Sequence, residues 1–265
     1  MHLEFLNLGS GSSGNCTYLK YGDARLLIDL GFSCKKIKEK LVSNNIDPCS
    51  IDGILITHGH SDHIKGLGLF CKELQIPVYC NPGTQTEILA AIKKDNKKTM
   101  PSFKIFNTGD RFSIKDISID TFRIPHDTSD PVGYMFKTGC IRVGVVTDLG
   151  KVTTLVTEHI RGAYALLFES NHDVDLLRHS NRPWSSKQRT LSSSGHLSNE
   201  QAATALEEIA MDGLKEIVLG HLSGECNTPD MALETTWNKL QGKEVNVKVS
   251  SQDGSTYILP TGFDV

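Results

Sequence analysis

Thr57-His58-Gly59-His60-Ser61-Asp62-His63 follows directly on the apolar run Ile54-Leu55-Ile56, so three histidines and a carboxylate stand at the end of a predicted buried strand. Imidazole nitrogens and carboxylate oxygens are the ligands that zinc and related divalent cations prefer. In extended backbone, side chains two positions apart lie on the same side, so His58 and His60 can bind one ion together. If a helix begins at the serine, the aspartate and the last histidine turn towards a second ion. The segment therefore predicts two adjacent metal sites rather than surface histidines in a polar turn.

The length and composition are ordinary, and the net charge is small. The chain has 265 residues, which suffices for one large α/β domain or two small ones. Hydrophobic residues make up 38% and charged residues 22%, as is ordinary for a soluble enzyme. The formal net charge of -3 provides no general attraction to nucleic acid, so such binding would need a local basic patch.

Cysteine usage and the apolar segments indicate a cytoplasmic protein. The seven cysteines, an odd number without a C-x-x-C pair, favour reduced thiols over a disulfide framework or a structural zinc finger. The N-terminus lacks the basic and apolar regions of a secretory signal. No apolar stretch approaches the roughly 20 residues needed to cross a bilayer. We therefore expect no membrane partner, and the sequence predicts no particular protein partner.

Short strands and helices alternate along the chain. The pattern predicts strands over residues 3–8, 16–21, 24–29, 51–57, 77–80, 103–106, 111–114, 117–124, 132–137, 140–147, 164–168, 216–219, 245–249 and 256–259. It predicts helices over residues 33–43, 62–74, 84–94, 152–159, 174–178, 199–210 and 229–240. Strands in two batches with helices outside them indicate two sheets between helical layers. Without internal repeats or a linker, residues 1–265 are expected to form one domain.

Further candidate ligands follow later strands. His126, Asp148 and His221 each come soon after a predicted strand ends. Each alone is ambiguous, because Asp148 could be a turn residue or a helix cap and His221 a polar loop residue. Together they supply the ligands that a binuclear centre would need beyond the opening segment.

In this order, the opening motif and the three later residues resemble the metallo-β-lactamase superfamily. The resemblance covers essentially the whole chain and implies an α/β fold, a four-layer αββα sandwich with a binuclear site at the sheet edges. Carried over position by position, the ligands of the first ion would be His58, His60 and His126, and those of the second Asp62, His63 and His221, with Asp148 bridging both. Relatives often have a larger residue at Gly59, but no ligand is lost there. The two divalent ions would be zinc by preference, with manganese or iron as alternatives.

Such a site implies metal-assisted hydrolysis. A cation lowers the pKa of bound water from about 15.7 towards 7, so a hydroxide bridging the two ions would attack the substrate. The expected catalytic residues are His196, Asp62 and Asp148. Asp29 and Asp127 are candidates for orienting the imidazoles, although a plain turn or surface role suits both equally well.

The segment Ser194-Gly195-His196 favours a phosphodiester substrate. Ser198 and Gln201 form a predicted capping box, which places His196 just outside a helix N-terminus, where backbone N–H groups favour an anion. A histidine there can donate to a phosphate oxygen or protonate a leaving alkoxide. The segment also resembles the S-G-H element of nuclease branches of the superfamily, and an exposed loop histidine is the alternative.

The Gly/Ser-rich loop at 9–15 offers backbone N–H groups and hydroxyls that could hold an anion, and its candidate substrate-binding residues are Ser12, Ser13 and Asn15. A flexible turn is the equal alternative. This loop resembles the start of the YycJ/WalJ-like branch of the superfamily, as do the segments at 130–134, 169–173 and 221–223. Members of that branch are regarded as nucleases that act on DNA ends.

A basic stretch between Leu176 and Asn199 leads into the S-G-H element and contains no Asp or Glu. Its Arg182, Lys187 and Arg189 would neutralise phosphates. Trp184 could stack on an unpaired base. A solvated charged face is the alternative, and it is the preferred interpretation of the lysines at 93, 94, 97 and 98.

The sequence therefore predicts a two-metal phosphodiesterase that cleaves nucleic acid, in the first place a DNA exonuclease, with DNA favoured over RNA. A phosphodiesterase for a small molecule or cyclic nucleotide is the nearest alternative, and it would need an enclosed pocket without a basic track. A metal-containing nucleic-acid-binding module without activity is the non-enzymatic alternative, which the intact ligand set disfavours. β-Lactam hydrolysis is disfavoured because no secretory signal is present.

Overall fold

The computed structural model describes residues 2–93 and 100–264, without the side chains of 260–262. Of the lysine cluster considered above, Lys94, Lys97 and Lys98 fall outside the described residues. Within the described part of the chain, no helix is long and apolar enough to cross a membrane.

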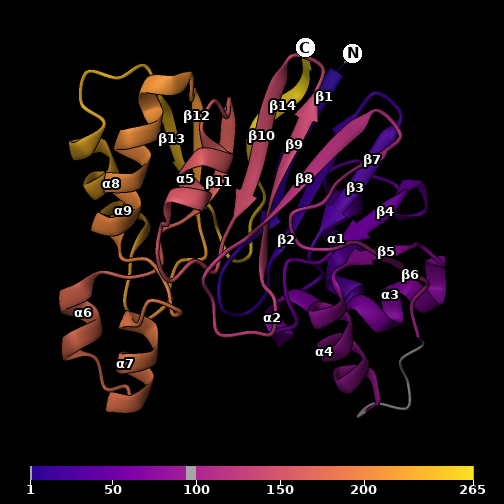
Figure 1. Ribbon diagram of the computed structural model, residues 1–265, viewed down its shortest axis with the longest axis horizontal. Helices are drawn as coiled ribbons and strands as arrows, with labels where there is room; N and C mark the ends of the chain where they lie inside the picture. Colours follow the sequence, from indigo (N-terminus) through magenta and orange to yellow (C-terminus); the bar gives the residue numbers. More distant parts are fainter. Residues whose placement is uncertain (1, 94–99, 265) are drawn as a thin grey trace.

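Two sheets lie against each other, and helices cover their outer faces (Figure 1). In the described residues the first sheet has the order β14-β1-β2-β3-β4-β5-β6 and the second β13-β12-β11-β10-β9-β8-β7. The strands of the first sheet are β1 (His2–Gly9), β2 (Cys16–Tyr21), β3 (Ala24–Ile28), β4 (Gly53–Leu55), β5 (Val78–Cys80), β6 (Phe103–Ile105) and β14 (Thr256–Asp264). The strands of the second sheet are β7 (Arg111–Ile114), β8 (Ile117–Arg123), β9 (Val132–Thr138), β10 (Ile141–Val146), β11 (Ala165–Glu169), β12 (Glu216–Gly220) and β13 (Asn246–Val249).

The helices form the two outer layers. The first sheet is covered by α1 (Cys34–Ser43), α3 (Leu67–Leu74) and α4 (Pro82–Lys93). The second sheet is covered by α5 (Thr154–Ile160), α8 (Asn199–Ile209) and α9 (Pro229–Lys239). The short helices α2 (Ser61–Ile64), α6 (Val174–His179) and α7 (Trp184–Leu191) lie at the lower end of the sheets in Figure 1.

Alternating side chains divide the core between these layers. In β1, Leu3 and Phe5 pack between the two sheets, where they belong to the same buried cluster as Tyr134 of the second sheet. Leu6 and Leu8 instead belong to the cluster beneath the first layer of helices. Strands buried on both faces are apolar almost throughout, which is why they read as continuous apolar runs. The predicted αββα sandwich is confirmed.

Apart from shifts in strand and helix bounds, the structure differs from the prediction at two helical segments. The helix predicted over 62–74 is divided into α2 and α3, and the chain between them passes close to Phe32, where a Cβ added to Gly66 would lie 2.4 Å from the Phe32 carbonyl oxygen. No helix is predicted at α7, because its sequence WSSKQRTL has apolar residues only at its two ends. Tertiary contacts, rather than an apolar stripe, hold this helix.

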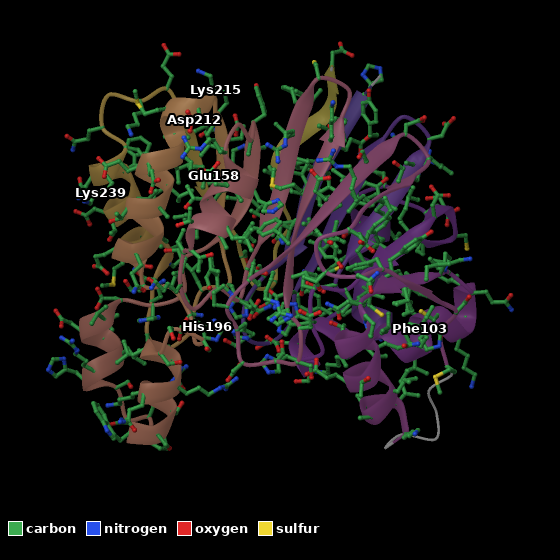
Figure 2. All side chains as sticks on the ribbon, viewed as in Figure 1. Phe103, Glu158, His196, Asp212, Lys215 and Lys239 are labelled. Atoms are coloured by element: carbon green, nitrogen blue, oxygen red, sulfur yellow. The ribbon has the colours of Figure 1, made fainter. Side chains whose placement is uncertain are left out.

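Several strand ends meet at one edge of the sandwich. The histidine motif follows β4 in the first sheet, while His126, Asp148 and His221 follow β8, β10 and β12 in the second. Figure 2 labels His196 at the same edge. Because β8, β10 and β12 run in the same direction, their carboxyl ends present their polar residues together.

Candidate metal centre and active site

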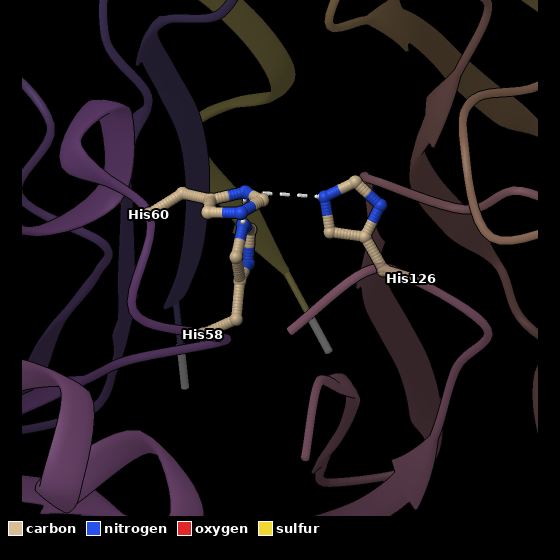
Figure 3. A group of neighbouring side chains, drawn as sticks. All are labelled: His58, His60 and His126. Carbon is tan, nitrogen blue, oxygen red and sulfur yellow. Dashed lines mark hydrogen bonds between the residues drawn. The ribbon is translucent and has the colours of Figure 1, made fainter. Parts of the chain in front are cut away.

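His58, His60 and His126 point their ring nitrogens at one another from two different sheets (Figure 3). His58 Nε2 lies 3.2 Å from His60 Nδ1, and His126 Nε2 lies 3.3 Å from the same atom. His58 and His126 are buried, and His60 is partly exposed. Three imidazoles at these distances form three of the four ligands of a tetrahedral cation site.

The outer nitrogens of two of these rings are already occupied. The Thr57 hydroxyl donates to Asp29 Oδ2 at 2.9 Å, so its oxygen accepts from His58 Nδ1 at 3.0 Å. His126 Nδ1 donates to the Gly195 carbonyl oxygen at 3.1 Å. A neutral imidazole has one donor and one acceptor, so the inner Nε2 atoms of His58 and His126 carry lone pairs.

The protonation of this first cluster suits a metal. Burial lowers the pKa of His58 well below its ordinary value, and the nearby His63 lowers it further. Burial also lowers the pKa of His60 and His126. Neutral imidazoles are the form that coordinates a cation, so the lowered pKa values of these three rings suit a metal site.

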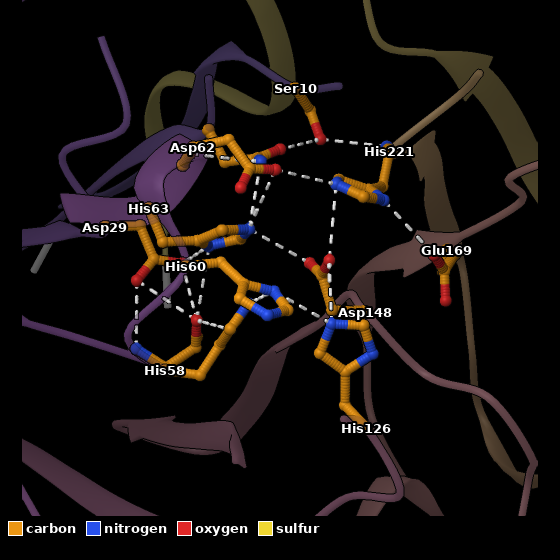
Figure 4. Close-up of polar contacts among 12 residues, drawn as sticks. Ser10, Asp29, His58, His60, Asp62, His63, His126, Asp148, Glu169 and His221 are labelled. Atoms are coloured by element: carbon orange, nitrogen blue, oxygen red, sulfur yellow. Dashed lines mark hydrogen bonds and ion pairs between the residues drawn. The ribbon is translucent and has the colours of Figure 1, made fainter. Parts of the chain in front are cut away.

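A second cluster consists of Asp62, His63, Asp148 and His221 (Figure 4). Asp148 Oδ2 lies 3.2 Å from His63 Nε2, and Asp148 Oδ1 lies 3.3 Å from His221 Nε2. His221 Nε2 also lies 3.4 Å from Asp62 Oδ2. Asp148 Oδ1 faces the first cluster as well, at 3.7 Å from His126 Nε2. Asp148 thus borders both clusters.

Asp148 is a buried carboxylate with too few partners. Its Oδ2 atom accepts no hydrogen bond from the described residues. Burial favours the neutral acid, but His221 and His63 hold the pKa of Asp148 well below its ordinary value. Burial opposes the charge of His221 too, yet Asp148 and its other carboxylate neighbours raise the pKa of His221 to about 10. In the metal-free protein, protons on His63 and His221 balance the Asp148 carboxylate; the donor sets of both clusters fit divalent metals, whose binding would release those protons.

The two residues predicted to orient the imidazoles differ in their contacts. Asp29 Oδ2 accepts from His63 Nδ1 at 2.8 Å, and Oδ1 accepts from the Thr57 N–H at 2.9 Å. Asp127 Oδ1 lies 3.7 Å from His60 Nε2 and is itself paired with Arg189. The hydrogen bond of Arg189 is the main cause that lowers the pKa of Asp127. Asp29 therefore holds a ring directly, whereas Asp127 chiefly binds Arg189.

Glu169 is a functional residue that the sequence reasoning missed. Its Oε1 atom accepts from His196 Nδ1 at 2.7 Å and from His221 Nδ1 at 3.2 Å. Burial raises the pKa of Glu169, but His196 and His221 hold it below its ordinary value. Glu169 ends β11, so the signal that selects Asp148 and His221, a polar residue at the end of an apolar strand, would also have selected it.

The S-G-H segment lies beside both clusters. The ring centroid of His196 is 5.1 Å from those of His126 and His221, and its side chain is 17% exposed. The predicted capping box of Ser198 and Gln201 is present at the start of α8. His196 is therefore a partly exposed ring beside the two clusters that belongs to neither proposed ligand set.

The Gly/Ser-rich loop contacts the histidine motif through Asn15. Asn15 is buried, and its Nδ2 atom lies 3.0 Å from His63 Nε2 and donates to the Asp62 carbonyl oxygen at 3.3 Å. The Ser13 N–H donates to Gln252 Oε1 at 3.0 Å. Asn15 therefore holds the loop against the metal motif, and Ser12 is the predicted substrate-binding residue of this loop that borders the open site.

A hollow of about 370 Å³ opens over the two clusters. Its lining residues are Ser12, His60, Ser61, Asp62, Asp148, Asn171, Arg182, Ser186, Arg189, Thr190, His196, His221 and Ser223. Of the three predicted basic residues, Arg182 and Arg189 are among them and Lys187 is not. Lys187 is buried and donates to the carbonyl oxygens of Arg178 and Ser180, both at 2.7 Å. Its ammonium therefore supports the α6–α7 turn, which corrects its expected place on a basic surface.

Trp184 is 62% exposed and does not line this hollow. It stands two residues before Ser186 on α7, on a different side of the helix from the lining residues Ser186, Arg189 and Thr190. The expected stacking of Trp184 on a base at the metal site therefore finds no support in its position.

Comparisons with known proteins agree with this arrangement. A family model described as "Beta-lactamase superfamily domain" matches residues 24–221. The chain is 37% identical over 250 residues to the exodeoxyribonuclease YycJ of Bacillus anthracis, covering 93% of this chain and 92% of the relative. It is 38% identical over 242 residues to the exodeoxyribonuclease WalJ of Streptococcus pneumoniae serotype 2 (strain D39 / NCTC 7466), covering 91% and 90%.

A solved structure shows the same fold. The metallo-β-lactamase fold protein YhfI from Bacillus subtilis matches with a TM-score of 0.71 over 97% of this chain and 99% of that chain. Its sequence identity is 16%, so this similarity bears on the fold and not on the substrate.

Proposed function

This chain belongs to the metallo-β-lactamase superfamily, in its YycJ/WalJ-like branch, and is a metal-dependent hydrolase, and we propose that it cleaves phosphodiester bonds in nucleic acid as a DNA exonuclease. The observation that carries the proposal is the position of Asp148, whose carboxylate borders two donor clusters beneath one open hollow. The choice of DNA and of an exonuclease rests on the two relatives, whose names state that activity and which match this chain over nearly its whole length.

We assign two divalent ions to the two clusters. The first would be held by His58, His60 and His126, the second by Asp62, His63 and His221, and Asp148 would bridge them. Zinc suits these donors best, and manganese or iron are the alternatives. When bound, such ions lower the pKa of water and offset negative charge on a phosphodiester.

The protein side chains supply position and proton transfer. His196 is a partly exposed imidazole beside the site and is not a proposed ligand; Glu169 accepts from its Nδ1 atom, so its Nε2 atom is left to serve the substrate. In the imidazolium form of His196, which carries a proton on both nitrogens, that atom can donate to a phosphate oxygen or protonate the leaving oxygen. Arg182 and Ser12 line the same hollow, and in this proposal they contact phosphates of the substrate.

The test is cleavage of end-labelled DNA and RNA, single- and double-stranded, by the metal-loaded protein. The expected result is stepwise loss of nucleotides from a DNA end, with bis(p-nitrophenyl) phosphate and cyclic nucleotides as poorer substrates. The His60→Ala and Asp148→Ala variants should lose cleavage while remaining folded. Asp116→Ala, in an exposed turn at the opposite end of β8 from His126, is the control and should retain cleavage.

Two outcomes would contradict the proposal. Full activity of Asp148→Ala would remove the bridge between the ions. Hydrolysis of cyclic nucleotides with no action on DNA would make the chain a small-molecule phosphodiesterase.

A further inference from the structure

At Gly59, between two of the proposed ligands, the side chain of another residue fills the space that a larger side chain would need. A Cβ built on Gly59 would lie 2.3 Å from both Cβ and Oε2 of Glu87. Glu87 belongs to α4, on the outer layer of the first sheet. Its Oε2 atom accepts the Gly59 N–H at 3.0 Å. The glycine thus leaves room for a carboxylate that binds the backbone between His58 and His60.

The other oxygen of the same carboxylate binds the loop that carries His126. Glu87 Oε1 accepts from the Ser129 N–H at 3.0 Å and from the Ser129 hydroxyl at 2.9 Å. Ser129 lies three residues after His126, between β8 and β9. One carboxylate therefore joins the two segments that supply the three histidines of the first cluster, although these segments come from different sheets.

The helix that carries Glu87 is itself fixed to this loop. Asn81, just before α4, donates to the Asp130 carbonyl oxygen at 2.7 Å and accepts from the Thr84 N–H at 2.8 Å. Farther along α4, Ile88 is fully buried beneath the helix layer. Since both the start and the inner face of α4 are held, Glu87 has a defined position from which to fix the two segments.

We infer that Glu87 is a positioning residue that sets the separation of His58 and His60 from His126, and thereby the affinity of the first cluster for its ion. The inference rests on the proposed ligand set, but not on the substrate. Each carboxylate oxygen receives a backbone N–H from a different segment, so an acceptor is needed on both sides. Glutamine has the same shape but one acceptor oxygen, and aspartate is one methylene too short to reach from the same backbone.

The experiment measures metal affinity, by competition with a chelator, in backgrounds that isolate each cluster. His221→Ala removes a ligand of the second cluster and leaves the first, whereas His126→Ala does the opposite. Glu87→Gln should weaken zinc binding about tenfold in the His221→Ala background, as is usual when a residue behind a ligand is lost. In the His126→Ala background the same change should leave zinc affinity unaltered.

Glu39→Gln is the matched control, because Glu39 is an exposed carboxylate of α1 whose nearest partner is Lys35 at 3.8 Å. It should leave zinc affinity unchanged in both backgrounds. Far-UV circular dichroism of the metal-free variants shows whether they are folded. Glu87→Gln is used because it is nearly isosteric and disturbs packing less than Glu87→Ala would. Equal zinc affinity with and without Glu87→Gln, or equal weakening at both clusters, would overturn the inference. Failure of DNA cleavage would refute the proposed substrate but leave this result standing.

Discussion

At the scale of single residues, Glu169 shows how one buried carboxylate can serve two histidines with different tasks. It accepts from His196, the proposed proton donor, and from His221, a proposed ligand, and so holds both rings with Nε2 directed inward. Glu169→Gln retains one acceptor oxygen and should reduce kcat/KM for DNA by about 10–100-fold, the usual effect of removing a residue that orients a ligand. Glu208→Gln, on the exposed face of α8, should have no effect. Unchanged kcat/KM in Glu169→Gln would show that neither ring needs this partner.

His172 gives a prediction for pH. The residue is 1% exposed, and neither ring nitrogen has a hydrogen-bond partner in the described residues. Burial lowers the pKa of His172 from 6.5 to about 4. The unfolded chain therefore binds a proton on this residue more readily than the folded protein, so its contribution to stability is present above about pH 6.5 and is lost as the pH falls to about 4.

The loss attributable to this one residue is about 3 kcal/mol between those limits. Urea unfolding of the metal-free wild type and of His172→Gln, each at about pH 7 and pH 4.5, measures this loss. Subtracting the pH effect in the variant from that in the wild type cancels the titration of the other groups. His172→Gln should show a smaller decrease of the unfolding free energy on acidification. If both proteins lose the same amount, His172 is not the buried neutral residue that the structure indicates.

At the scale of elements, the α6–α7 hairpin separates basic residues that looked equivalent in the sequence. The stretch could be identified as basic, but which side chains face the site depends on α7, a helix without an apolar stripe that only the folded structure reveals. Arg182 lines the hollow and pairs with Glu225 at 2.7 Å, while Lys187 points inward to backbone carbonyl groups. Helical geometry then places Trp184 away from the site.

This arrangement makes opposite predictions for two similar substitutions. If Arg182 contacts a phosphate as proposed, Arg182→Gln should lower DNA affinity and decrease the slope of log K against log salt by about 1. Lys187→Gln should leave that slope unchanged and instead lower the unfolding free energy, since two carbonyl groups lose a charged donor. Fluorescence anisotropy with labelled single-stranded DNA at several salt concentrations, together with urea unfolding, measures both effects. An equal change of slope in the two variants would contradict the separation.

At the scale of the whole molecule, the site joins the two halves of the sandwich. Strand ends followed by polar residues could be found locally in the sequence, and the resemblance to the superfamily then implied the αββα architecture and the seven clustered side chains. The roles of Asn15 and Glu87 could not, because each contacts residues far away in the chain: Asn15 meets His63, and Glu87 meets Gly59 and Ser129. Such contacts exist only after both sheets have packed together.

Metal binding should therefore stabilise the packing of the sheets and not merely the loops. The first sheet supplies His58, His60, Asp62 and His63, and the second supplies His126, Asp148 and His221. A ligand that binds only the folded state adds about 2.7 kcal/mol at a free concentration about 100 times its Kd. Zinc should accordingly raise the urea midpoint of the metal-free protein.

His126→Ala removes the second sheet's histidine from the first cluster. Zinc should therefore stabilise this variant only by the amount that the second cluster provides. Unfolding curves followed by tryptophan fluorescence, with zinc buffered at fixed free concentrations, measure the gain, and excess chelator should abolish it. A midpoint that does not depend on zinc in the wild type would mean that the two halves are held without the ions, and that the seven side chains do not form a metal centre.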